Sequence, residues 1–192
     1  MQSIKLHFEE AQEVLQSFLG NDENFLKIAQ AGDLILEAIN KGNKIISCGN
    51  GGSMCDAIHF AEELSGRYKH HRKSLPAISI SDASHITCVA NDYGFDHIFS
   101  RFVEGLGNAG DVLFAISTSG NSENILNAIT VAQVKNMKVI ALTGKTGGKM
   151  ASNCDIEIRA PYSEFSDRAQ EIHIKVIHSI IDYVEKNLPS SN

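Results

Sequence analysis

Two pairs of polar side chains stand in segments whose apolar residues recur at helical spacing. His59 and Glu63 lie four residues apart, so they would share one face of a helix. Gln170 and His178 lie eight residues apart, about 80° apart in direction around a helix, so both could lean toward one pocket. Together the four residues could hold a metal ion. Imidazole and carboxylate suit zinc, whereas an amide oxygen suits it less well and would leave an exchangeable position.

Each pair also has a simpler interpretation, which the residues alone leave open. A His and a Glu at this spacing are commonly a surface pair. A His inside an apolar run, such as His178, is commonly a hydrogen-bonded residue of the core.

Two loops rich in Gly and Ser follow apolar runs. The first reads GNGGS, residues 49–53, where Gly allows positive φ and close approach of a ligand, and Ser53 could cap the next helix. The second reads STSGNSEN, residues 117–124, with four hydroxyl side chains around one Gly. Neither loop contains Lys or Arg, so a phosphate would be held by hydroxyls, backbone N–H groups and a helix dipole. The alternative is that both are only tight strand-to-helix turns.

Two nucleotide-binding motifs are incomplete. The dinucleotide fingerprint would require Gly where Met54 stands. The stretch TGKTGGK, residues 143–149, resembles a phosphate-binding P-loop, but Val139 replaces its first Gly and Met150 follows Lys149. Nucleotide binding is therefore not the leading hypothesis, although a loose NAD or ATP site stays an alternative.

The elements that would position these residues alternate between strands and helices. Helical periodicity covers residues 3–19, 23–41 and 163–187. Five short apolar runs lie between them: KIISC, PAISI, DVLFAIS, KVIALT and DIEIR. This alternation predicts an α/β fold with a mainly parallel sheet covered on both faces. We expect a single domain over residues 1–192, with leading helices in 1–42 and an α/β sandwich in 43–192.

Composition excludes several classes of protein. The chain has 192 residues, 43% of them hydrophobic, which is enough for one sizeable core. The net charge of -6, with scattered Lys and Arg, argues against nucleic-acid binding. We expect a cytoplasmic protein, since the first residues do not resemble a signal peptide and no segment would span a membrane. The four Cys residues show no C-x-x-C spacing, which favours reduced thiols.

The helical segments carry more apolar positions than one face can hold. Those of the last segment run from Ile172 to Val184, and the leading helices have apolar stripes that include Ile28. We expect a partner subunit to cover this surplus, with Ile28 in the interface.

The runs SCGNGGSMCDAIHFAEELSGRY, AISTSGNSENILNAI, ALTGKTGGKM and RAQEIHIKVIH strongly resemble the phosphoheptose isomerases, which belong to the sugar isomerase (SIS) domain family. The resemblance implies a three-layer, doubly wound (flavodoxin-like) five-stranded parallel sheet with two extra N-terminal helices, and a homotetramer. It also implies interconversion of D-sedoheptulose 7-phosphate and D-glycero-D-manno-heptose 7-phosphate, the first step of heptose supply for lipopolysaccharide.

Carried over by position, the family's functional residues have the expected types. The zinc ligands fall on His59, Glu63, Gln170 and His178. The substrate contacts fall on Asn50, Gly51, Gly52, Ser53, Asn91, Asp92, Ser117, Thr118, Ser119, Ser122 and Gln170. Aldose–ketose isomerisation through an enediol needs an acid and a base, and Glu63 and His178 are our candidates.

The alternative comes from the same domain family. Its non-catalytic members bind a bacterial replication initiator or sense a sugar phosphate, and they lack the acid and base pair that Glu63 and His178 provide here. An isomerase acting on another sugar phosphate is a further alternative.

Overall fold

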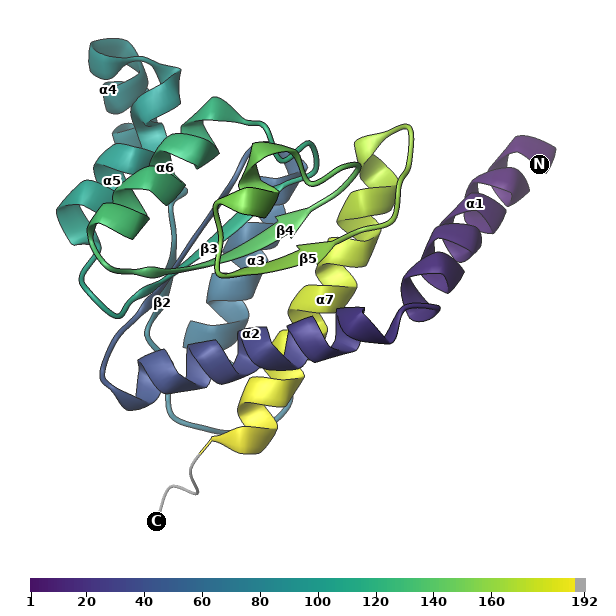
Figure 1. Cartoon of the computed structure of the whole chain (residues 1–192), viewed down its shortest axis with the longest axis horizontal. Coiled ribbons are helices and arrows are strands. Elements are labelled where there is room, and N and C mark those ends of the chain that lie inside the picture. Colours follow the sequence, from purple (N-terminus) through teal and green to yellow (C-terminus); the bar gives the residue numbers. More distant parts are fainter. Residues whose placement is uncertain (189–192) are drawn as a thin grey trace.

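Five parallel strands form one sheet with helices on both faces, as the computed structural model in Figure 1 shows; it describes residues 1–188. The helices are α1 (Gln2–Leu19), α2 (Asp22–Asn40), α3 (Gly52–Ser65), α4 (Ala83–Tyr93), α5 (Ile98–Leu106), α6 (Glu123–Val134) and α7 (Ser166–Asn187), with short 3-10 helices η1 (Phe95–His97) and η2 (Gly148–Ser152). The strands are β1 (Ile45–Gly49), β2 (Ala77–Ser79), β3 (Val112–Ser117), β4 (Lys138–Thr143) and β5 (Ile156–Arg159). The end of the predicted domain, residues 189–192, lies outside the described residues.

The strand order is β2-β1-β3-β4-β5, which is the doubly wound, flavodoxin-like order. Each of the five apolar runs is a strand, and the two leading helices precede the sheet. The predicted fold class is therefore confirmed.

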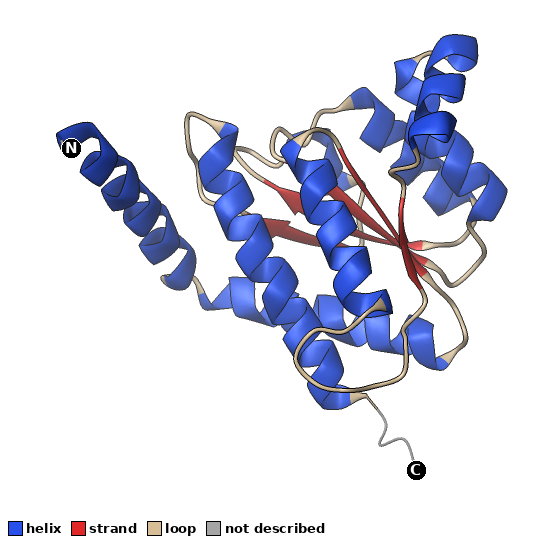
Figure 2. Cartoon of the chain, turned by 180° about the vertical axis from the view of Figure 1, so that it is seen from behind, coloured by secondary structure: helices blue, strands red, loops and turns tan. Residues whose placement is uncertain are grey.

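The strands are apolar throughout because both of their faces are buried. In β3, Phe114 belongs to a core shared with α2, α3 and α7, whereas its neighbour Ala115 belongs to a core shared with α4, α5 and α6. Figure 2 shows the two helical layers on opposite sides of the sheet. Consequently α3 and α7, which carry the four candidate metal ligands, lie on the same face and pack against each other.

The first helix, α1, extends away from the sheet (Figure 1). Its apolar side chains Ile4, Leu6 and Phe8 are exposed. The second helix is held at its start by Asn21, whose side-chain oxygen accepts a hydrogen bond from the backbone N–H of Glu23 at 3.2 Å. Among residues 1–188, no helix is both long and apolar enough to cross a bilayer.

The expected apolar surplus of the last helix was wrong. Of the side chains from Ile172 to Val184 that were counted as surplus, all but Ile174 lie in the core of this same chain, because α7 is covered by α2, α3 and the sheet. Ile174 is partly buried and packs against that core. Ile28 is also a core residue of this chain and only 8% exposed, so it does not belong to a surplus apolar surface. Exposed apolar side chains do gather on α1 and at the start of α2, where Phe25 and Leu26 are exposed.

Candidate active site

The two Gly- and Ser-rich loops meet where the strand order reverses, between β1 and β3. In an open parallel sheet this point forms a crevice outside the carboxyl ends of the strands. Asn50 and Asn124 join the loops through two reciprocal side-chain hydrogen bonds of 2.9 Å, each amide donating to the other's oxygen. Sequence analysis missed Asn124, which is buried. Asn50, a predicted substrate contact, therefore also holds the two loops together.

The first loop brings its backbone close to other elements. Gly51 has φ 55° and ψ -122°, which glycine alone adopts readily. Gly52 faces α7: a Cβ there would lie 2.5 Å from Nε2 of Gln170. The expectation that Ser53 caps α3 was wrong, because the helix already begins at Gly52 and its N-cap is Gly51, without a side-chain cap. Ser53 is instead buried in the first turn.

The second loop gathers hydroxyl groups at the start of α6. Oγ of Ser117 lies 3.0 Å from Oγ of Ser122 and 3.4 Å from Oγ of Ser119. No side chain caps the first turn of α6, so the hydroxyls stand beside the positive end of a 12-residue helix. Thr118 is half-buried between Ser117 and Ser119. This arrangement can hold a phosphate without a cationic side chain.

The P-loop-like stretch, residues 143–149, packs against the second loop, residues 117–124, which we call the hydroxyl loop. The backbone of Gly120 packs so closely on Gly147 that a Cβ on Gly120 would collide with the Gly147 carbonyl. The Met150 N–H donates to the Gly120 carbonyl at 3.0 Å, and the Lys149 N–H donates to Oδ1 of Asn121 at 3.0 Å. The glycines of this stretch are thus explained by loop packing.

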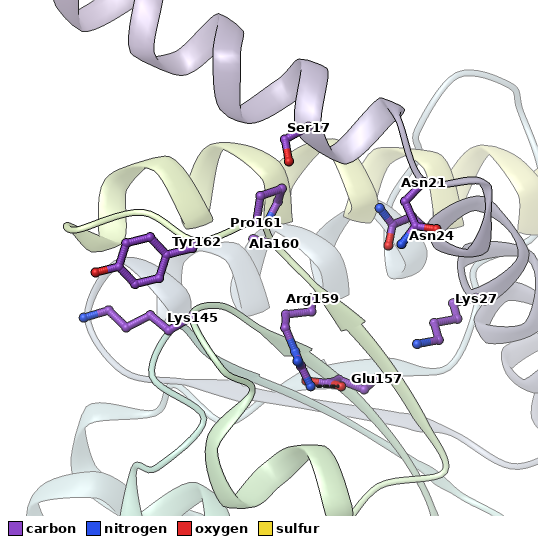
Figure 3. A pocket seen from close by; sticks show the side chains of 10 residues that line it. All are labelled: Ser17, Asn21, Asn24, Lys27, Lys145, Glu157, Arg159, Ala160, Pro161 and Tyr162. Atoms are coloured by element: carbon purple, nitrogen blue, oxygen red, sulfur yellow. Dashed lines mark hydrogen bonds and ion pairs between the residues drawn. The ribbon is translucent and has the colours of Figure 1, made fainter.

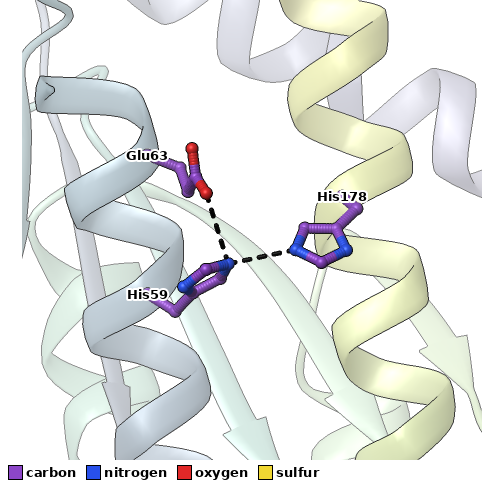
Figure 4. Close-up of side chains that lie close together, drawn as sticks. All are labelled: His59, Glu63 and His178. Atoms are coloured by element: carbon purple, nitrogen blue, oxygen red, sulfur yellow. Dashed lines mark hydrogen bonds and ion pairs between the residues drawn. The ribbon is translucent and has the colours of Figure 1, made fainter. Parts of the chain in front are cut away.

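Three of the four candidate metal ligands converge between α3 and α7 (Figure 4). Nε2 of His59 lies 3.0 Å from Nε2 of His178 and 3.5 Å from Oε1 of Glu63. One donor atom from each residue lies within 4.8 Å of the other two. His178 is therefore not a hydrogen-bonded core residue, and His59 and Glu63 are more than a surface pair.

The surroundings favour the neutral form of His178. Its pKa is lowered, first by burial and then by the nearby His59, while Glu63 acts in the opposite direction. The ring of Tyr68 stacks on the imidazole of His178, with 5.8 Å between centroids and 24° between planes. A neutral imidazole is the form that binds a metal ion or accepts a proton.

The converging residues fit a zinc ion. Two imidazole nitrogens and one carboxylate oxygen are a typical donor set for a site that keeps one position open. Gln170, the fourth predicted ligand, packs with its amide against Gly52. Its ligation of zinc stays a prediction.

Comparison with known proteins identifies the family to which this site belongs. The family model for the SIS domain matches residues 7–144. Phosphoheptose isomerases of Histophilus somni and Vibrio cholerae are 57% and 56% identical to the chain; the alignments cover 96% of it and 95% and 97% of those proteins. The structure of a phosphoheptose isomerase from Neisseria gonorrhoeae superposes with a TM-score of 0.89 at 40% identity, covering 96% of this chain and 98% of that one.

The chain belongs to the phosphoheptose isomerase family of SIS domains. It is therefore an enzyme, an isomerase, and the non-catalytic alternative is set aside. The predicted resemblance is confirmed. The individual roles of the site residues rest on the geometry described above.

Two residues assigned by resemblance to the phosphoheptose isomerases stand on a different part of the fold. Asn91 and Asp92 are exposed at the end of α4, where Nδ2 of Asn91 donates to Oδ1 of Asp92 at 2.7 Å. Helix α4 packs against α5 and η1 on the face of the sheet opposite α3 and α7. Their role as substrate contacts stays a prediction.

One more titratable group lies near His59, Glu63 and His178, which we call the triad, and the sequence alone did not single it out. Asp56 lies three residues before His59 on α3, and burial raises the pKa of its carboxyl to about 6, while His59 lowers it. Its buried Oδ2 has no hydrogen-bond partner. The three-residue spacing to His59 was the available signal in the sequence.

A separate cavity of about 460 Å³ lies beside β5, the end of α1 and the start of α2 (Figure 3). Lys27, Lys145 and Arg159 line it together with Glu157. Glu157 engages Arg159 through two contacts, of 2.8 and 2.7 Å, so much of the charge is already compensated. His59, Glu63 and His178 do not line this cavity, so it is separate from the candidate active site.

Proposed function

We propose that the chain interconverts D-sedoheptulose 7-phosphate and D-glycero-D-manno-heptose 7-phosphate by proton transfer through an enediol. The observation that carries the proposal is the approach of Glu63 and His178 on facing helices, within reach of one small group. We further propose that residues 1–192 form a single cytoplasmic domain whose product supplies heptose for lipopolysaccharide.

In this mechanism the phosphate lies against the hydroxyl loop. Ser117, Ser119 and Ser122 donate to its oxygens, and the amino end of α6 favours its negative charge. The other end of the sugar then lies between α3 and α7.

Glu63 and His178 act as the acid and base pair. One of them removes the proton from the carbon beside the carbonyl, and the other protonates the carbonyl oxygen, which gives the enediol. Returning a proton to the adjacent carbon and removing one from the other hydroxyl completes the exchange of aldose and ketose. A zinc ion held by His59, Glu63 and His178, with Gln170 as the proposed fourth ligand, would polarise the carbonyl.

Solvent exchange tests this mechanism. Incubating the enzyme with sedoheptulose 7-phosphate in D₂O is expected to give an aldose that carries deuterium at C2, because the proton passes through an acid–base group that exchanges with solvent. Proton NMR of the product measures the label. An aldose whose C2 hydrogen comes entirely from C1 of the ketose, with no deuterium, would point to a direct hydride shift and contradict the proposed proton transfer.

We also propose a homotetramer whose active site is completed by a neighbouring subunit. The proposal is supported by the exposed apolar side chains of α1 and by a cavity of about 520 Å³ between α1 and α7. It is also supported by the position of α4, which carries Asn91 and Asp92. This helix lies on the face of the sheet opposite α3 and α7, so one subunit alone does not bring these residues to the triad.

Phe8→Glu is expected to lower the oligomeric state and the activity together. Phe8 is 71% exposed and lines the cavity between α1 and α7, so a carboxylate there would be buried in an assembled interface. Light scattering and an activity assay on one sample measure both quantities. Gln16→Glu, at an exposed position of the same helix that does not line this cavity, is the control for added charge. A fully active monomer would refute the shared site.

A further inference from the structure

The segment that follows α3 crosses over to α7 and binds both helices. Residues 66–75 connect the end of α3 to β2, and they include Tyr68 and Arg72. We call residues 66–75 the strap. It contacts the triad directly, because the ring of Tyr68 stacks on His178.

The guanidinium of Arg72 is the centre of the strap. Its Nη2 donates to the backbone carbonyl of Glu63 at 2.6 Å, and its Nη1 donates to that of Leu64 at 2.8 Å. These carbonyls belong to the last turn of α3, where a cation complements the helix dipole. One of them belongs to Glu63 itself, so Arg72 holds the backbone from which a candidate metal ligand projects.

On its other side, Arg72 is paired with Glu185 of α7. Nε of Arg72 donates to Oε1 of Glu185 at 2.9 Å, and the two side chains are only 9% and 3% exposed. The backbone N–H groups of Lys69 and His70 donate to Oε2 of Glu185, each at 3.3 Å. The carboxylate is therefore fully engaged by the strap.

Glu185 and His178 lie seven residues apart on α7, which is two helical turns, so they share one face. A link from α3 to Glu185 is thus also a link to the helix face that presents His178. Since a buried charged pair is a weak source of net stability, its presence between these two helices calls for another explanation.

We propose that Arg72 and Glu185 are positioning residues, which set the separation of α3 and α7 so that His59, Glu63 and His178 meet around one metal ion. This inference rests on the metal site of the proposed function. Groups that orient metal ligands from the second layer typically contribute 10- to 100-fold to metal affinity, and we expect effects of about that size here.

The test compares zinc affinity among Arg72→Lys, Glu185→Gln and the double variant. Lys cannot reproduce the fork that reaches two carbonyls and a carboxylate, and Gln removes the charge while keeping the shape. Zinc affinity is measured by competition with a chromogenic chelator. The visible spectrum of the cobalt(II)-loaded protein reports the ligand geometry independently of activity.

Asp111→Asn is the matched control for loss of stability. Asp111 is 1% exposed and paired with Lys44 at the amino edge of the sheet, where it touches neither α3 nor α7. All variants are compared at a temperature well below their melting points.

We expect each single variant to weaken zinc binding about 10- to 100-fold and to change the cobalt spectrum. The double variant should cost less than the sum of the singles, because both residues act through one contact. Asp111→Asn should lower the melting temperature but leave zinc affinity and spectrum unchanged.

Three results would overturn the inference. Folded Arg72 and Glu185 variants with wild-type zinc affinity and spectrum would make the pair merely structural. An equal loss of affinity in Asp111→Asn would make the effect one of general loosening. A wild-type chain that isomerises its substrate but binds no zinc would remove the metal site on which the inference depends, whereas a wild-type chain that binds zinc without isomerising would overturn the proposed function alone.

Discussion

Glu63→Gln is expected to lower the turnover of sedoheptulose 7-phosphate by about 10²- to 10⁴-fold, the range typical for loss of a general acid or base. Gln keeps the size of the side chain but cannot exchange a proton at neutral pH. The Glu63 side chain is partly buried beside His59. Because Gln has nearly the same shape as Glu, the substitution should leave the packing of α3 on α7 largely intact.

Glu62→Gln is the matched control for this experiment. Glu62 precedes Glu63 on the same helix, and its side chain is 62% exposed, with Oε2 3.9 Å from Nδ1 of His59. It should keep near-wild-type turnover. Wild-type turnover in purified, folded Glu63→Gln would refute the proposed role of Glu63.

Zinc content separates the two roles proposed for Glu63. If Glu63→Gln keeps its zinc and loses turnover, the carboxylate acts in proton transfer. If zinc and turnover are lost together and both return at high zinc concentration, Glu63 serves as a ligand, and another residue must supply the acid or base.

The arrangement of the strands was readable because a strand buried on both faces is a continuous apolar run. All five runs, from KIISC to DIEIR, are strands of one parallel sheet. The positions of His59 and Glu63 were equally readable, since a spacing of four residues is enough to put two side chains on one face of a helix.

Contacts between distant segments could not be read in this way. Asn50 pairs with Asn124 across 74 residues, and Arg72 pairs with Glu185 across 113 residues. The sequence around an Asn or an Arg does not indicate such a distant partner, because the pairing depends on the strand order that brings the two segments together.

Apolar patterning misled where it was read as surplus surface. A helix that packs against both a sheet and two other helices is buried around most of its circumference, and α7 is such a helix. The pattern of Ile172 to Val184 therefore described a central helix of the domain, whereas exposed apolar side chains such as Ile4, Leu6 and Phe8 lie on α1.

The hydroxyl loop carries the other large effect that we expect. Oγ of Ser119 lies 3.4 Å from Oγ of Ser117 and accepts a hydrogen bond from the N–H of Asn121 at 3.2 Å. Both contacts are long, so they hold the Ser119 hydroxyl only weakly. A hydroxyl in this position can turn toward a phosphate oxygen. Hydrogen bonds to charged groups contribute about 1.5–3 kcal/mol, which corresponds to about 10- to 150-fold in affinity.

Ser119→Ala is therefore expected to raise the KM for sedoheptulose 7-phosphate by about 10- to 150-fold, with a smaller effect on kcat, because the phosphate is bound alike in substrate and transition state. Unphosphorylated sedoheptulose, which lacks the group that Ser119 would contact, should be isomerised equally well by wild type and variant. Thr130→Ala is the matched control, since it removes an exposed hydroxyl from the far half of the same helix, where that hydroxyl donates to the Leu126 carbonyl. An equal loss for both sugars would mean that Ser119 shapes the loop and does not bind phosphate.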